Sequence, residues 1–258
     1  MNKFLSIAAI SALLATAASA DLMRIEGSVG AWQSDPTGTI QYGNNPATQF
    51  DVVDTAGFEA TTNTYAWLYI KHPIPIVPNV RFEYVNPNFD AKTKAELSYG
   101  DETFSAGANN ALSLTQYDAV LYYNILDNTF WTTIDLGLDI KFIDGNYNIT
   151  GDAGGNTVTV DQDFDLAMPL GYVRGRVQIP VTEIGIEAIV RGMSYSGNTV
   201  VDTQIKLDYT MGFIPVIQPG IEIGYRHQQV TLDAGSIGID ANIDTTFSGV
   251  YGGIMLRF

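Results

Sequence analysis

The sequence contains no cysteine, only two histidines and no uninterrupted apolar run long enough to cross a membrane as a helix. Without cysteine there are no disulfides, so stability must come from backbone pairing and side-chain packing. Transmembrane helices are excluded because each needs about 20 consecutive apolar residues. Basic residues are also scarce, with 13 Lys and Arg against 28 Asp and Glu. The resulting formal net charge of −15 argues against a nucleic-acid partner.

Residues 1–20 have the pattern of a secretory signal peptide. Lys3 gives a short positive start, residues 4–17 are apolar or small, and Ala18-Ser19-Ala20 forms a small-x-small cleavage site before Asp21. We therefore predict that the protein is exported, that the signal peptide is cleaved, and that residues 21–258 form a single domain.

From Leu22 onward the hydrophobic pattern repeats every two residues, as in β-strands with one apolar face. In residues 130–143, for example, Ile134, Leu136 and Leu138 alternate with Asp135 and Gly137. Segments of this length exceed the usual five or six residues and match the roughly 9–11 that cross a membrane at a tilt. Ten such segments are predicted, at residues 22–32, 63–72, 79–86, 115–126, 129–143, 162–179, 182–195, 200–213, 219–232 and 246–258.

The predicted fold is all-β, a closed antiparallel transmembrane β-barrel of ten strands, with eight or twelve strands as alternatives. Short turns follow the second, fourth, sixth and eighth segments, at residues 73–78, 126–128, 179–181 and 214–219. Long polar loops are predicted at 33–62, 87–114 and 144–161, and a tight hairpin at Ser196-Gly197-Asn198. This is the layout of a bacterial outer-membrane barrel with both termini in the periplasm. The last segment is expected to pair with the first, which removes both open edges.

The sixth segment interrupts the alternation. Leu166 and Leu170 share one parity, whereas Val173 and Val177 share the other. A β-bulge near Pro169 would produce this shift, because one extra residue moves all later side chains to the opposite face. Two separate strands are the alternative explanation.

The alternation also assigns the charged residues to one face of the sheet. A Lys or Arg facing hydrocarbon costs about 2–4 kcal/mol at mid-depth, so this face is predicted to line the lumen. The predicted lumen charges are Arg24, Glu26, Arg81, Glu83, Asp135, Asp139, Lys141, Arg174, Arg176, Glu187, Arg191, Asp202, Lys206, Asp208, Glu222 and Arg226. They either pair across a narrow interior and fill it or line a thin pore of mixed charge.

The excess acid lies in the predicted loops. Asp161, Asp163 and Asp165 resemble the start of a calcium loop, but Leu166 and Tyr172 stand where such a loop needs Gly and Glu. The expected partners are outer-membrane lipid and lipopolysaccharide. These carboxylates either form a plain acidic surface or, as a hypothesis, bind a divalent cation weakly and bridge to lipopolysaccharide.

No catalytic residue, cofactor or dedicated metal site is predicted. The omptin proteases resemble this chain in length and strand number, but their Asp-x-His arrangement is absent, since Tyr225 stands two residues before His227. His72 lies in a proline-rich turn at the periplasmic end. A lipase would need a Ser near His227, and Ser248 on a neighbouring strand is the candidate.

The last eight residues resemble the signal that the barrel assembly machinery reads, through Tyr251, Gly253, Leu256 and the terminal Phe258. The whole chain also resembles a group of small, largely uncharacterised Gram-negative outer-membrane barrels, through Val29-Gly30-Ala31-Trp32 and the turn from His72 to Asn79. The resemblance implies an outer-membrane location and a barrel that inserts with the assembly machinery as partner. It implies no substrate.

Three classes of function follow. The first is a non-enzymatic barrel, structural or narrow and porin-like, with a lumen of paired charges. The second is a surface binding or adhesion protein that acts through its long acidic loops. The third, an envelope lipase or protease, has the least support in the sequence.

Overall fold

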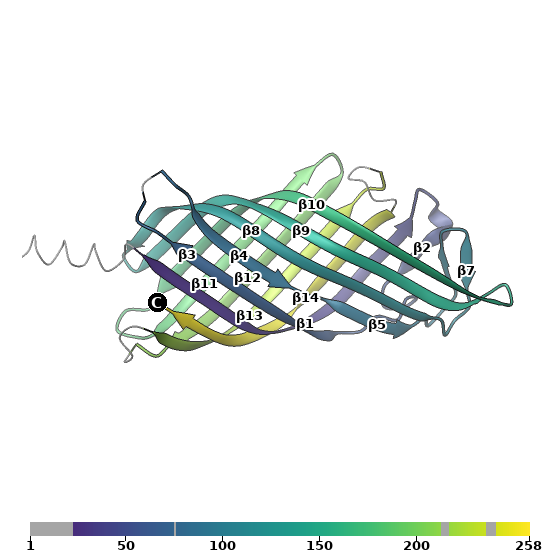
Figure 1. Cartoon of the computed structure of the whole chain (residues 1–258), viewed down its shortest axis with the longest axis horizontal. Helices are drawn as coiled ribbons and strands as arrows, with labels where there is room; N and C mark the ends of the chain where they lie inside the picture. The colour runs from purple at the N-terminus through teal and green to yellow at the C-terminus, as the bar shows by residue number, and fades with distance from the viewer. Residues whose placement is uncertain (1–22, 75, 213–216, 236–240) are drawn as a thin grey trace, which may run out of the picture.

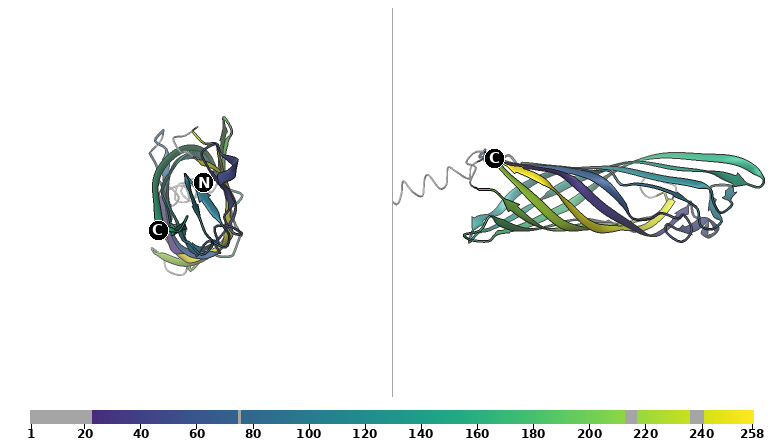
Figure 2. Two further views of the ribbon diagram at one scale, coloured as in Figure 1. Left: turned by 90° about the vertical axis from the view of Figure 1, so that its right-hand side faces the viewer. Right: turned by 90° about the horizontal axis from the view of Figure 1, so that it is seen from below.

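The computed structural model describes residues 23–74, 76–212, 217–235 and 241–258. The predicted signal peptide lies outside these residues. Within them, ten antiparallel strands close into a barrel, as predicted (Figures 1 and 2). The strands are β1 (Arg24–Tyr42), β3 (Thr61–Lys71), β4 (Asn79–Val85), β8 (Asn109–Thr129), β9 (Thr132–Ala153), β10 (Asn156–Gln178), β11 (Ile184–Tyr195), β12 (Asn198–Thr210), β13 (Gln218–Leu232) and β14 (Ala241–Arg257).

The last strand closes the barrel against the first. β14 pairs with β1 from Glu26↔Arg257 to Tyr42↔Ala241. Both edges of the sheet are removed by this pairing, so no row of unpaired backbone groups is left facing lipid at the seam. Gly30 and Gly253 lie opposite each other at the seam, and a Cβ on Gly253 would approach the hydroxyl of Tyr65 to 2.5 Å. The two glycines leave room for that aromatic ring inside the barrel.

A belt of apolar side chains surrounds the outside of the barrel. On β9 it comprises Ile134, Leu136, Leu138, Ile140 and Phe142, which are 37–69% exposed. Outward aromatic side chains lie at both edges of the belt. They are Tyr117, Phe142 and Tyr225 on one side, and Tyr123, Tyr209 and Phe258 on the other. A closed barrel with an apolar belt between aromatic girdles is an integral outer-membrane protein. Among the described residues no helix is long and apolar enough to cross a membrane, a finding that bears on helical spans alone.

Beyond the belt, on the side away from the C-terminus, the barrel continues as a tapering structure that we call the extension. It comprises residues 36–60, 86–115, 144–165, 229–235 and 241–245. The hairpin of β9 and β10 projects past the β11–β12 hairpin (Figure 1). Short elements complete the extension. They are the 3-10 helix η1 (Pro46–Thr48) and the strands β2 (Gln49–Asp51), β5 (Asn88–Lys92), β6 (Leu97–Tyr99) and β7 (Glu102–Phe104).

The polarity of the two faces reverses between the belt and the extension. In β9, inward Asp139 and Lys141 are followed by inward Tyr147 and Ile149, while outward Leu138 gives way to outward Asn148. The reversal has a simple cause, because the exterior faces hydrocarbon at the belt and water in the extension. In the extension the apolar side chains therefore point inward and form a core.

Two predictions about this region are wrong, the long loops and the bulge. The loops expected at 33–62, 87–114 and 144–161 consist largely of strand continuations and the small strands β2, β5, β6 and β7. The bulge in the sixth segment is absent, since β10 pairs with β9 in one unbroken register from Asn156↔Ala153 to Val177↔Thr132. Leu166, Leu170 and Arg174 all face inward, so the parity never changes. Only the medium outside the strand changes, from water in the extension to hydrocarbon at the belt.

The turns at the C-terminal end of the barrel are short where the structure describes them, with one shift, whereas residue 75 of the first predicted turn and residues 214–216 of the last lie outside the described residues. The turn between β8 and β9 lies at Phe130-Trp131, not at 126–128, and both residues have positive φ of 51° and 61°. At the other end, the tight hairpin predicted at Ser196-Gly197-Asn198 is present, with Ser196 and Gly197 as its two loop residues at φ of 49° and 87°, the left-handed geometry that matches strand twist.

Candidate functional site

The charged side chains predicted to line the lumen lie inside the membrane-spanning barrel. All of them except Arg24 are buried. Arg24 lies at the end of the barrel near the C-terminus, where its guanidinium contacts Glu26, and its side chain is 23% exposed. Glu26 also binds Arg257, so both ends of the chain that form the seam share one carboxylate.

One centre of the interior network is Glu83 on β4. Its carboxylate accepts from Arg191 at 2.6 Å and from Gln204 at 2.8 Å, and it pairs with Arg226 at 3.0 Å. Arg191 and Arg226 also pair with Asp202 on β12, at 3.3 and 2.5 Å. Strands β8, β9 and β10 separate β4 from β11 in the sheet, so the Glu83–Arg191 pair crosses the lumen.

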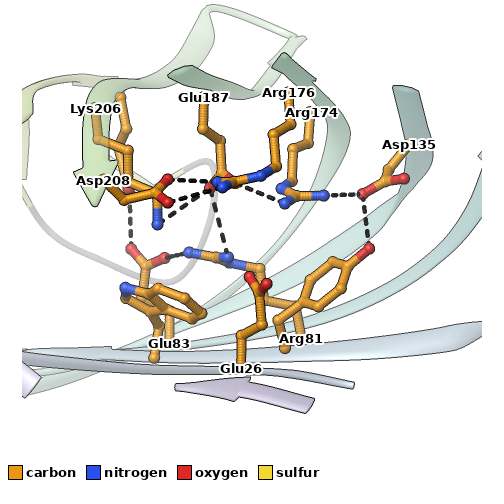
Figure 3. A network of polar contacts seen from close by, with 12 residues as sticks. Glu26, Arg81, Glu83, Asp135, Arg174, Arg176, Glu187, Lys206 and Asp208 are labelled. Atoms are coloured by element: carbon orange, nitrogen blue, oxygen red, sulfur yellow. Dashed lines mark hydrogen bonds and ion pairs between the residues drawn. The ribbon is translucent and has the colours of Figure 1, made fainter. Parts of the chain in front are cut away.

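The second centre is Glu187 on β11 (Figure 3). It pairs with Arg174 at 2.6 Å and with Arg176 and Lys206 at 3.4 Å each. These cations carry the network onward. Arg174 reaches Asp135 at 2.7 Å, Arg176 reaches Asp208 at 2.5 Å, and Lys206 reaches Glu222 at 2.8 Å. Arg81 joins the two centres, at 3.1 Å from Glu83 and 4.0 Å from Glu187.

Aromatic and amide side chains that the sequence reading did not include complete the network. Trp67 donates to Glu222 at 2.9 Å, and its ring lies 4.0 Å from the ammonium of Lys206. The Tyr69 ring lies 4.5 Å from the Arg174 guanidinium. Above the charges, Gln116 and Gln228 exchange hydrogen bonds of 3.1 and 2.8 Å across the lumen. The sequence signal that could have identified these residues is their position in the alternation, which places them on the inward face of their strands.

The network fills the interior at the level of the membrane. A cavity beside Glu83 and Arg226 measures about 10 Å³, close to the space that one water molecule needs. Buried charges are tolerated when opposite charges and hydrogen bonds surround them, and each carboxylate at the two centres has at least three such partners. The arrangement leaves little free volume.

The two histidines lie apart from the network. His72 stabilises its turn, since its ring accepts from the backbone N–H of Ile74 at 3.2 Å and contacts the Pro78 carbonyl at 3.1 Å. His227 faces outward on β13 and lies opposite Ser248 of β14. Among the described residues no hydrogen bond joins these two side chains, and no carboxylate contacts His227.

The residues of the predicted assembly signal divide between the two faces of β14. Tyr251 is buried inside and packs edge-on against Tyr65 at 5.3 Å, whereas Leu256 and Phe258 face the membrane and are about half exposed. Gly253 lies at the seam with β1.

The acidic residues Asp161, Asp163 and Asp165 lie along the outer face of β10. Asn146 donates to Asp161 and Asp163 at 2.8 and 2.7 Å. Across the described ranges, no group of three His, Asp or Glu side chains is placed to hold a metal ion.

Comparison with known proteins gives no family assignment. No protein-family model matches the chain, and no curated protein matches it in sequence. The beta domain of the Bordetella autotransporter BrkA superposes with a TM-score of 0.31 and 16% identity, over 87% of this chain and 98% of that one. The Pseudomonas putida toluene transporter TodX gives 0.34 and 6%, and a Pseudomonas aeruginosa FadL homologue gives 0.32 and 8%, each over 92% of this chain and 90% of the other. At these scores the likeness carries no functional weight.

Proposed function

We propose that this protein is a non-enzymatic outer-membrane barrel with a closed lumen, which anchors and displays the extension at the cell surface. The observation that carries the proposal is the ion-pair network that crosses the lumen, above all Arg191 bound to Glu83 at 2.6 Å and to Asp202 at 3.3 Å. A solute would have to displace several mutually paired charges, and each unpaired buried charge costs several kcal/mol.

The extension supports the second half of the proposal. It has its own apolar core, in which Phe50, Phe58, Phe89 and Phe104 are at most 3% exposed. Asn110 ties a strand to the connection before β3 by donating to the Ala56 carbonyl at 2.8 Å. A passive membrane plug has no need of such a core. A surface that must hold its shape for binding does, and this favours the binding class among the alternatives.

Conductance in a planar lipid bilayer tests the closed lumen. We expect the purified wild-type protein to show no conductance steps under conditions in which a general porin shows them. The double variant Glu83→Ala, Arg191→Ala removes a pair that crosses the lumen without changing the net charge, and it is expected to introduce small, flickering currents. Regular open-channel steps in the wild-type protein would establish the porin-like alternative in place of this proposal.

A further inference from the structure

The interior of the extension contains a cavity far larger than any space needed for packing. Its volume is about 440 Å³, within the 300–1,000 Å³ range of small-molecule sites. Leu112, Tyr147, Val230, Leu232 and Phe247 line its walls, and they come from strands β8, β9, β13 and β14. The Gln116 amide, which is bonded to Gln228, lies at the end nearest the membrane network. The cavity therefore sits directly above the closed lumen.

One wall of the cavity is an unpaired strand edge. β10 pairs with β9 along its whole length, but its pairing with β11 begins only at Gly171↔Gly192. Residues 162–166 of that free edge line the cavity, as does Ile243 near the start of β14. The ring of Phe164 lies over Gly145, where a Cβ would come within 2.2 Å of it. The cavity thus has a side opening beside β10, formed because the β9–β10 hairpin is longer than its neighbour β11–β12 (Figure 1).

The chemistry of the lining restricts the ligand. Of the residues that the structure describes, the charged ones that line the cavity are Asp163 and Asp165, both at the exposed edge, and none of the lining residues is Lys or Arg. An anionic ligand would meet two carboxylates and no cation. Tyr147 also lines the cavity, and burial raises the pKa of its phenol, with a further rise from nearby Tyr99, so it adds no charge to the lining.

We propose that this cavity binds an uncharged, largely apolar small molecule that enters beside β10. The apolar walls supply the binding free energy, since removing apolar surface from water yields about 25 cal/mol per Å². This site goes beyond the proposed closed barrel, and it exists whether or not the lumen conducts.

Binding can be measured with the neutral fluorophore N-phenyl-1-naphthylamine on the full chain in lipid nanodiscs, with empty nanodiscs as background. We expect saturable fluorescence above that background. The signal should be displaced by 1-dodecanol and hardly at all by dodecanoate, which has the same chain length but a negative head. Absence of saturable binding to the wild-type protein overturns the proposal, and equal displacement by dodecanoate overturns the assignment of an uncharged ligand.

Variants locate the site. Val230→Trp fills the cavity and should weaken binding of the fluorophore by about tenfold or more, or about 1.4 kcal/mol. Gln229→Trp places the same ring on the outer face of the same strand and should leave binding within about twofold of wild type. Leu112→Trp repeats the test from β8 in case Val230→Trp fails to fold, with folding followed by heat-dependent gel mobility. Wild-type affinity in both cavity variants contradicts the assignment.

Discussion

The membrane-spanning barrel and the extension are built from the same strands with opposite polarity. At the level of the belt, charges such as Glu83 and Arg191 are inside and residues such as Leu138 are outside. In the extension, Phe104 and Ile149 are inside and Asn148 and Asp163 are outside. The comparison shows that a two-residue alternation defines two faces but does not say which face is apolar. The medium around each part of the strand decides that.

The two regions also differ in how completely they are packed. The barrel lumen is filled by ion pairs and leaves a cavity of about 10 Å³, whereas the extension surrounds about 440 Å³. Charged side chains are long and reach partners across the lumen, which closes it. The apolar side chains of the extension have no comparable reach, and the unpaired edge of β10 leaves one side open.

The largest effect is expected from breaking the network at Arg191. Arg191→Met leaves Glu83, Asp139 and Asp202 without a shared cation, and we expect a loss of about 3–5 kcal/mol in the free energy of unfolding. The matched change in the extension is Lys94→Met. It removes an exposed pair with Glu59 at 3.6 Å and should cost at most about 1 kcal/mol. Urea unfolding in lipid vesicles measures both, and equal losses would contradict the distinction between the regions.

A charge placed on the outer face tests where the membrane ends. Leu138 and Asn148 both face outward on β9, ten residues apart along one strand. Leu138→Arg should destabilise the barrel by about 2–4 kcal/mol, because it places a guanidinium in hydrocarbon. Asn148→Arg faces water and should change stability by less than about 0.5 kcal/mol. If Asn148→Arg destabilises the protein as much as Leu138→Arg, the belt extends further than the alternation of outward residues indicates.

The smallest effect comes from removing one methyl group. Ile149→Val in the core of the extension should cost about 0.5–1.5 kcal/mol, since Ile149 is fully buried. Ile140→Val on the lipid-facing side should cost close to nothing, because Ile140 is 47% exposed to an apolar medium. Amide hydrogen exchange of the β9–β10 hairpin would detect the first change. Unaltered exchange in Ile149→Val would show that the interior of the extension is loosely packed.

Much of the barrel could be predicted from the chain. The ten strands, their antiparallel order, the closure of the last onto the first and the Ser196-Gly197 hairpin all follow from local pattern. The parity of Glu83, Glu187 and Arg191 placed them on one face, but their pairing could not be deduced. Arg191 and Glu83 are 108 residues apart, and their contact depends on the register of every strand between them.

The extension was misread for a related reason. Residues 144–161 alternate as regularly as the rest of β9 and β10, with Tyr147, Ile149 and Ala153 facing inward. Their polar neighbours suggested a loop, because long polar stretches between the predicted strands were assigned to loops. For a related reason, the change in polarity of the two faces near Leu166 was interpreted as a bulge, although the register of β10 with β9 does not change there.

The sequence by itself determined that this protein is a barrel, because strand alternation and turn chemistry are local properties that can be recognised without knowledge of tertiary contacts. Only the tertiary structure decided that the lumen is closed by specific ion pairs and that a cavity lies above them. The ion pairs depend on which side chains meet across the barrel, and the cavity depends on which strands end early. These contacts form only when the sheet closes, and no local sequence pattern specifies them.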